Sequence, residues 1–223
     1  MARTALTMTA ATLTATAALL LTACGGGGDD SSQDDIKGAE TSTNSATPSP
    51  SASASDSSDV DRPDVSLPED LKLVFDFEKP SDAEQAAALD DAANYIRALD
   101  HGIAQQDPND PAYQFYSTGG AAKYAKSQIE AWVKDGWTVT GNDRYFNASI
   151  DPVGEGKSTL ITFCRNQAKF YSKKVKTGKV NYTDENLDSY QKFSLLMSPS
   201  EQSAKVWQAR QIEVQGRVKE CQG

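Results

Sequence analysis

Three consecutive polar residues, Asp143, Arg144 and Tyr145, form the combination in this sequence that is best suited to chemistry on a small molecule. If these side chains line a cavity, the Arg144 guanidinium could clamp an anion and the Tyr145 hydroxyl could donate a hydrogen bond to a carbonyl oxygen. The alternative is structural, with an ion pair and a packed tyrosine at the start of a strand. The sequence thus indicates a candidate pocket here and leaves both interpretations open.

His101 is the single histidine, and it directly follows Asp100 in a helical stretch. Neighbours in sequence do not share a helix face, so a general base at His101 would need a carboxylate brought to it by the fold. Otherwise it is a solvated partner of the helix dipole. The sequence contains no nucleophile elbow, phosphate loop, dinucleotide fingerprint or Cys-x-x-Cys pair. We therefore predict no catalytic residue, no metal and no cofactor.

Charge is distributed unevenly along the 223 residues. Residues 25–70 carry eleven acidic and two basic residues, whereas residues 71–223 carry twenty acidic and nineteen basic ones. The excess of acidic residues thus lies in the N-terminal part. Residues 71–223 have no excess of basic residues, so the charge does not point to a nucleic-acid partner. Lysines are dense in residues 169–179, KFYSKKVKTGK, where they could bind an anionic wall polymer or form the solvated face of a hairpin.

The first 23 residues carry one positive charge, Arg3, followed by an uncharged run rich in Ala, Thr and Leu. A positive start, a short apolar core and small residues at its end are typical of a secretory signal peptide. Residues 4–23 are nominally long enough for a transmembrane anchor, which is the alternative. This stretch is rich in Thr and Ala, and no basic residues follow it to hold an orientation, so we predict a signal peptide over residues 1–23.

Cys24 follows Leu21, Thr22 and Ala23 at the end of this run. The four residues resemble the lipobox of bacterial lipoproteins. The resemblance implies that a diacylglyceryl group is attached to the Cys24 thiol and that the chain is cut just before it. The lipid bilayer would then be a partner through the acylated Cys24, and the protein would lie at the extracytoplasmic face of the cell membrane.

Residues 24–70 are expected to form a disordered acidic tether. All eighteen Phe, Tyr and Trp residues lie beyond this segment, in which Ser, Thr, Asp, Ala and Pro dominate. A segment with so little apolar surface cannot offset the entropy lost on ordering. The globular domain is therefore expected over residues 71–223, a length that suits a single core.

Two further cysteines, Cys164 and Cys221, lie in the expected domain. If Cys24 carries lipid, they form an even pair in an exported protein, where oxidising conditions favour disulfides. We predict a Cys164–Cys221 disulfide that ties down the C-terminus. Two free buried thiols are the alternative.

Helical periodicity dominates the first part of the domain. Residues 79–106 are predicted to form a helix with Ser81 and Glu84 as its capping box. Its buried stripe consists of aliphatic residues at three-to-four spacing: Leu89, Ala92, Ala93, Ile96, Leu99 and Ile103. A second helix is predicted from near Gly120 to Lys134, with Gly136 as its C-terminal cap.

The periodicity changes to two after Gly136, which is typical of strands. The predicted strands cover residues 137–150, 158–166, 168–175, 189–198 and 205–216, with residues 71–78 as an edge segment and 176–179 as a hairpin tip. Helices followed by meandering strands predict an α+β domain in which the N-terminal helices pack on an antiparallel sheet.

This order of elements resembles the nuclear transport factor 2-like fold, which also occurs in ketosteroid isomerases. The resemblance implies a cone-like domain with helices in the concave face of a curved sheet. The chain also looks like a group of actinobacterial lipoproteins of unknown function that carry three short motifs. These are Gly-x-Asp-Arg-Tyr-aromatic, Cys-x-x-Gln and Lys-Thr-Gly-Lys, here at residues 141–146, 164–167 and 176–179. Residues 164–166 depart from the acidic residues expected there, so no acidic pair is predicted to function at this point.

We expect a non-enzymatic binding or scaffold domain, displayed outside the membrane on its tether. Its partner would be a cell-envelope protein, a wall polymer or a small apolar ligand held between helices and sheet. A solute-binding lipoprotein and a small isomerase-like enzyme that uses the cone cavity are the alternatives. The domain is short for a two-lobed ligand clamp, and the sequence offers no recognisable acid–base pair for an enzyme.

Overall fold

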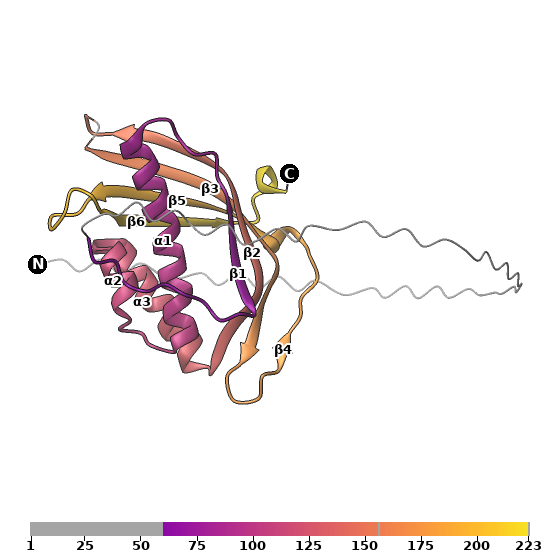
Figure 1. The fold of residues 1–223 in the computed structure, drawn as a ribbon. Coiled ribbons are helices and arrows are strands. Elements are labelled where there is room, and N and C mark those ends of the chain that lie inside the picture. The colour runs from indigo at the N-terminus through magenta and orange to yellow at the C-terminus, as the bar shows by residue number, and fades with distance from the viewer. Residues whose placement is uncertain (1–59, 156, 223) are drawn as a thin grey trace, which may run out of the picture. The chain divides into compact units, whose positions relative to one another are not determined.

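The computed structural model describes residues 60–155 and 157–222 (Figure 1). The predicted signal peptide, Cys24 and the predicted tether up to residue 59 lie outside the described residues. Within them, α1 and the other helices lie on one side of a curved sheet. The α+β architecture predicted from the sequence is therefore confirmed.

Three α-helices occur in the described residues: α1 (Ala83–Gln105), α2 (Pro111–Tyr116) and α3 (Gly119–Lys134). The Asp82 side chain caps α1 by accepting a hydrogen bond from the Gln85 backbone N–H at 2.9 Å. The predicted capping box at Ser81 and Glu84 is therefore wrong by one residue, because a carboxylate satisfies the free N–H group equally well. None of the described helices is both long and apolar enough to cross a membrane.

The short helix α2 is absent from the sequence prediction. The Asp110 side chain accepts a hydrogen bond from the Ala112 backbone N–H at 2.7 Å, and Pro111 occupies the first helical position, where a missing N–H costs nothing. The end of α3 is as predicted. Gly136 adopts a positive φ of 65° and donates its N–H to the Val133 carbonyl.

Six strands in the described part of the chain form one sheet in the order β1-β2-β3-β5-β6, with β4 paired to β3 off this path. They are β1 (Leu71–Asp76), β2 (Trp137–Val153), β3 (Ser158–Lys174), β4 (Val180–Asn181), β5 (Tyr190–Pro199) and β6 (Trp207–Gly216). All pairs are antiparallel except β1 with β2, because the chain crosses over through the helices between these two strands. The strands predicted at 158–166 and 168–175 are in fact one, β3.

Two register shifts between β2 and β3 bend the sheet. One places an extra residue in β3 opposite Asn142 and Arg144, and the other places one in β2 near Asn147, whose φ is 53°. An extra residue bends its strand and raises the twist, so the sheet curves around the helices. The core lies in this concave face, and its largest fully buried apolar and aromatic side chains are Tyr95, Tyr116, Tyr145, Phe163, Ile103, Ile129, Ile161, Leu195 and Met197.

The C-terminal end is fixed to β3 by the predicted disulfide. Cys164 and Cys221 are bonded, with their Cα atoms 5.3 Å apart. Both cysteines are buried with Phe146, Tyr190 and Val218 in a second, smaller cluster. Because side chains alternate along a strand, Cys164 points away from the face that holds Phe163 and Arg165.

Residues 60–70 contact the domain, although the sequence analysis assigned them to the tether. Arg62 forms an ion pair with the buried Asp91 of α1, and Asp91 also accepts a hydrogen bond from the Trp207 backbone N–H at 2.8 Å. Val65 and Leu67 pack against the main core. The domain thus begins before the predicted boundary at Leu71, because one arginine and two aliphatic residues suffice to fix a segment whose average composition is polar.

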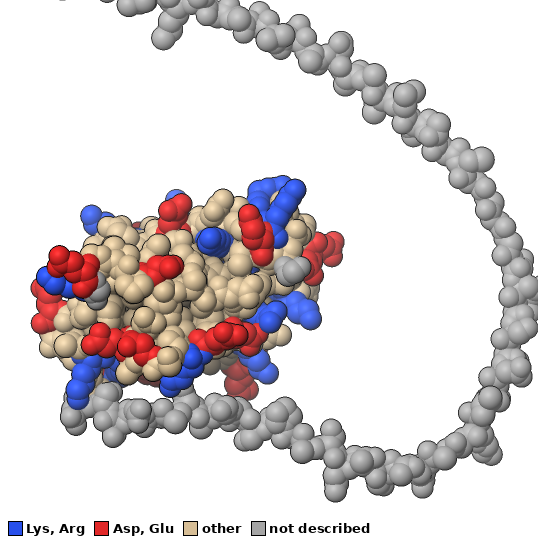
Figure 2. Space-filling model, turned by 90° about the horizontal axis from the view of Figure 1, so that it is seen from above, with Lys and Arg blue, Asp and Glu red and all other residues tan. Residues whose placement is uncertain are grey.

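Acidic and basic side chains are interspersed over the face of the domain displayed in Figure 2. This agrees with the nearly equal numbers of acidic and basic residues beyond residue 70.

Candidate functional site: a cavity between the helices and the sheet

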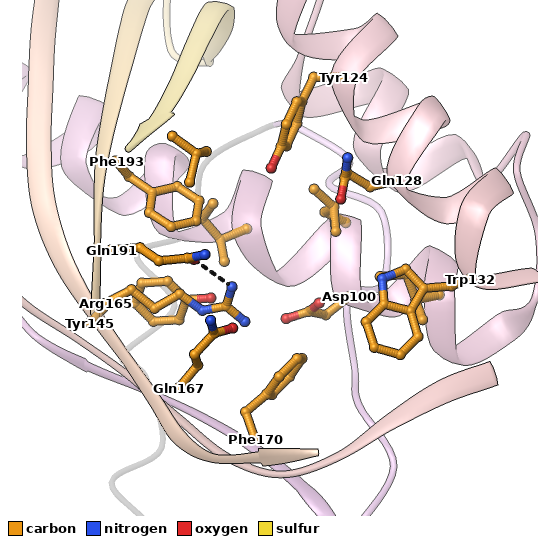
Figure 3. A pocket seen from close by; sticks show the side chains of 14 residues that line it. Asp100, Tyr124, Gln128, Trp132, Tyr145, Arg165, Gln167, Phe170, Gln191 and Phe193 are labelled. Atoms are coloured by element: carbon orange, nitrogen blue, oxygen red, sulfur yellow. Dashed lines mark hydrogen bonds between the residues drawn. The ribbon is translucent and has the colours of Figure 1, made fainter. Parts of the chain in front are cut away.

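A cavity of ≈ 220 Å³ lies between α1, α3 and the concave face of the sheet (Figure 3). Its walls combine aliphatic and aromatic side chains with five polar or charged ones. The lining residues are Ile96, Leu99, Asp100, Ile103, Tyr124, Gln128, Trp132, Tyr145, Arg165, Gln167, Phe170, Gln191, Phe193 and Val214. A cavity in which polar groups converge between apolar and aromatic side chains is a usual form of a small-molecule site.

Helical spacing places the residues of the helical wall. Tyr124, Gln128 and Trp132 follow one another at intervals of four along α3, so they share one face. On α1, Asp100 lies four residues after Ile96 and three before Ile103, within the apolar stripe that faces the sheet. The helix that builds the core thus also carries a carboxyl group into the cavity.

The β3 bulge shapes the opposite wall. Arg165 and Gln167 point into the cavity, as expected for alternating residues of a strand. Phe170 also lines it although it is three residues beyond Gln167, because the extra residue in β3 shifts the alternation between them. A regular strand would turn Phe170 outwards.

Arg165 is the centre of a buried polar network. Its Nε donates to both carboxylate oxygens of Asp143 at 2.9 and 2.8 Å, and its Nη1 donates to the Gln191 side-chain oxygen at 3.0 Å. The Tyr145 hydroxyl donates to Asp143 at 2.8 Å. Burial alone would lower the pKa of Arg165, but the adjacent Asp143 carboxylate outweighs it and the net shift is upward. Arg165 therefore stays charged, and Asp143 is its counter-ion.

Asp100 is the unpaired acid of the cavity. Its relative exposure is 4%, and its Oδ2 atom has no hydrogen-bond partner among the described residues. Burial raises the pKa of Asp100 to about 7, the Asp143 charge adds to this rise, and Arg165 opposes it. The carboxyl group of Asp100 therefore changes its charge near neutral pH.

The structure separates the three residues that the sequence analysis grouped as a candidate pocket. Tyr145 lines the cavity and Asp143 lies directly behind Arg165. Arg144 points to the other side of the sheet, where its Nε lies 2.5 Å from an Asp76 oxygen. It therefore cannot clamp a ligand in the cavity, because consecutive residues of a strand face opposite ways. Arg165 provides the guanidinium there instead.

His101 lies outside the cavity. Its Nδ1 is 2.9 Å from an Asp110 oxygen, so the fold does bring a carboxylate to this histidine. The same carboxyl group caps α2 through its other oxygen, and both side chains are largely buried. The pair thus joins the end of α1 to the start of α2.

Two of the five lysines in residues 169–179 have close neighbours at the surface. Lys173 lies 2.5 Å from an Asp70 oxygen, and the Lys174 ammonium lies 3.8 Å from the centre of the Trp137 ring. Gly178, with a φ of 68°, donates to the Lys174 carbonyl and forms the turn predicted at residues 176–179. Binding of an anionic wall polymer to these lysines stays a prediction.

Asp100 and Arg165 are the site residues that the sequence analysis missed. The spacing of Asp100 from Ile96 and Ile103 places an acid inside an apolar stripe of α1. That spacing was a usable signal. Arg165 could not be found in the same way, since its role depends on Asp143, which is 22 residues away.

No family model matches the chain, and neither does any curated protein. Among solved structures, the chain is similar to a nuclear transport factor 2-like superfamily protein from Salmonella enterica serovar Typhimurium, with 13% identity over 63% of this chain and 94% of that one and a TM-score of 0.39. It is also similar to a ketosteroid isomerase-like protein from Shewanella frigidimarina, with 13% identity over 60% and 98% of the two chains and a TM-score of 0.32. A third is the intermembrane space region of the chloroplast protein ARC6, with 10% identity over 59% and 96% and a TM-score of 0.38. At these values the similarities carry no argument about function, which has to come from the site itself.

Proposed function

We propose that this protein is a ligand-binding lipoprotein whose domain holds a small organic molecule in the cavity between α1, α3 and the sheet. The observation that carries the proposal is Asp100, a buried carboxyl group that lines the cavity and whose Oδ2 atom lacks a partner among the described residues. An unsatisfied buried polar group costs free energy, so a site that keeps one gains when a ligand supplies the partner.

The cellular setting of this proposal rests on the sequence. Cys24 after Leu21, Thr22 and Ala23 supports acylation, and the acidic segment that follows supports a tether. The domain would then be displayed at the extracytoplasmic face of the membrane, within reach of ligands from the cell envelope. Of the partners expected from the sequence, the small ligand is the one that the cavity favours.

The test of ligand binding uses an occluded cavity and a matched control. Gln128→Trp places an indole in the cavity, whereas Gln105→Trp makes the same change at an exposed position of α1. We expect benzyl alcohol to shift NMR signals of residues that line the cavity in the wild type and in Gln105→Trp, and not in Gln128→Trp. Equal shifts in all three proteins, or shifts confined to the outer surface, would contradict the proposal.

A second candidate function is proton transfer by Asp100. The observation that favours it is that Asp100 is buried yet lines the cavity, and this burial raises its pKa to about 7. A general base works best when its pKa is near the working pH. This is the isomerase-like alternative of the sequence analysis. Turnover of a carbonyl compound that is abolished in Asp100→Asn would establish it, and turnover unchanged by this substitution would exclude Asp100 as the base.

A further inference from the structure

When Asp100 is ionised, the charged groups around the cavity do not balance by themselves. Arg165 and Asp100 line it, and Asp143 lies behind Arg165 with an oxygen 2.5 Å from the Arg165 Nη2. The Arg165 charge is thereby matched. The ionised form of Asp100 then leaves one negative charge in a buried place, where an unmatched charge is costly.

The walls near Asp100 are suited to a cation. Tyr124, Trp132 and Phe170 border the same space as the Asp100 carboxyl group (Figure 3). The faces of aromatic rings attract cations, most strongly where water is excluded. Arg165 already shows this attraction, because its guanidinium carbon lies 4.8 Å from the centre of the Phe170 ring.

We infer that the cavity binds a small protonated amine, with the ammonium group on Asp100 and the apolar body of the ligand against the aromatic wall. This inference rests on the proposed ligand-binding function and narrows its ligand to organic monocations. An ammonium group supplies the hydrogen-bond donor that Asp100 Oδ2 lacks and cancels the surplus charge.

Ligands of other charge fit less well. A carboxylate would approach Arg165 but would share it with Asp143 and would face Asp100 as well. A neutral ligand would leave ionised Asp100 without a counter-ion. The size of the cavity also sets a limit, since a cavity of about 150 Å³ can hold benzene. The ≈ 220 Å³ here therefore suits one ring with a short arm.

Three probes with one ring, similar size and different charge test this inference: benzylamine, benzyl alcohol and benzoate. Calorimetric titration at pH 8 is made with the full-length protein in detergent and with its Asp100→Asn variant, which keeps the size of the side chain and removes its charge. We expect benzylamine to bind the wild type most tightly. In Asp100→Asn its affinity should fall by about tenfold or more, the factor that corresponds to a lost charge-assisted hydrogen bond. Benzyl alcohol should bind both proteins alike.

A second measurement needs no variant. The titratable and charged groups facing Asp100 in the described residues are Arg165 of β3, Asp143 and Tyr145 of β2, and Tyr124 of α3. Asp100 has a pKa of about 7, so at pH 6 it is mostly protonated and must lose its proton when an ammonium group binds. We expect benzylamine binding to release most of a proton at pH 6 and only about a tenth of a proton at pH 8, measured in buffers of different ionisation enthalpy.

The possible failures are distinguishable. If benzyl alcohol or benzoate binds more tightly than benzylamine, or if Asp100→Asn binds benzylamine unchanged, the amine inference is overturned and the ligand-binding function stands. If none of the three probes binds at millimolar concentration, both are contradicted. If Asp100→Asn does not fold, benzylamine binding to the wild type without proton release at pH 6 overturns the inference.

Discussion

Arg165 donates from its Nε to both carboxylate oxygens of Asp143, at 2.9 and 2.8 Å. This pairing spans 22 residues and joins β2 to β3 beneath the cavity. It holds the guanidinium in place and neutralises it, which leaves Asp100 as the acid available to a ligand. A buried ion pair of this kind stabilises the fold only while both partners are present.

Asp143→Asn should therefore destabilise the domain strongly. We expect the free energy of unfolding to fall by about 3–5 kcal/mol, because Arg165 would be left as a buried charge without its partner. Urea unfolding followed by circular dichroism measures this. The control is Arg144→Gln, which breaks the exposed pair with Asp76 and should cost less than about 1 kcal/mol. Equal losses of unfolding free energy in the two variants would refute the role of Asp143 as the buried counter-ion of Arg165.

Asp100 should make stability depend on pH in an unusual direction. Its pKa in the folded state is about 7 against 3.8 ordinarily, so between pH 4 and 7 the folded state holds a proton that the unfolded state has lost. The raised pKa of Asp100 therefore lowers the free energy of unfolding as pH rises through this window. Above pH 7 the proton is lost from both states, so the contribution of Asp100 stays constant. Relative to the wild type, Asp100→Asn should gain stability from pH 4 to 7, by at most about 4 kcal/mol.

Unfolding free energies measured from pH 4 to 8 check this dependence. The variant Glu213→Gln, at an exposed position of β6, serves as the control and should follow the wild-type profile. A constant difference between Asp100→Asn and the wild type over the whole range would contradict the raised pKa.

The disulfide should stabilise the domain substantially. Cys164 and Cys221 are 57 residues apart, and closing a loop of that length corresponds to about 4 kcal/mol in the chain-entropy model. We expect the double variant Cys164→Ala/Cys221→Ala to lose roughly this amount in urea unfolding. Reduced wild type should behave in the same way. Peptide mapping without reduction provides the independent check, and two free thiols in protein from the native host would refute the bond.

The contact of Arg62 with Asp91 should protect the chain N-terminal to β1. We expect limited proteolysis of the wild type to leave a core that begins before Arg62. In Arg62→Ala the core should begin closer to Leu71, because the ion pair that holds residues 60–70 is lost. Arg217→Ala removes an exposed ion pair with Asp188 and should leave the cleavage site unchanged. Mass spectrometry of the fragments identifies the boundary.

Acylation of Cys24 predicts the location of the protein in the cell. Cys24→Ala should release the protein into the medium or leave it unprocessed, because the thiol that carries the lipid is gone. Cell fractionation and the mass of the N-terminal peptide measure this outcome. If the variant is cut at the same bond and still partitions with membranes, the lipoprotein proposal fails.

The sequence by itself determined the features that depend on residues close together in the chain. The apolar stripe of α1, the glycine that ends α3, the turn at residues 176–179 and the change from helices to strands after Gly136 follow from propensity and periodicity over a few residues. The pairing of Cys164 with Cys221 followed from counting cysteines under the assumption of export. It needed no knowledge of where the two residues lie in space.

Only the tertiary structure decided which residues meet. The alternation of β2 separates Arg144 from Asp143 and Tyr145, and the bulge in β3 turns Phe170 inwards. The fold also brings Arg165 to Asp143 and leaves Asp100 of α1 unpaired between helix and sheet. Such relationships join residues far apart in the chain, and their free energy depends on burial and on the charge of neighbours. The burial of each residue and the charges next to it are set only when the helices pack against the curved sheet.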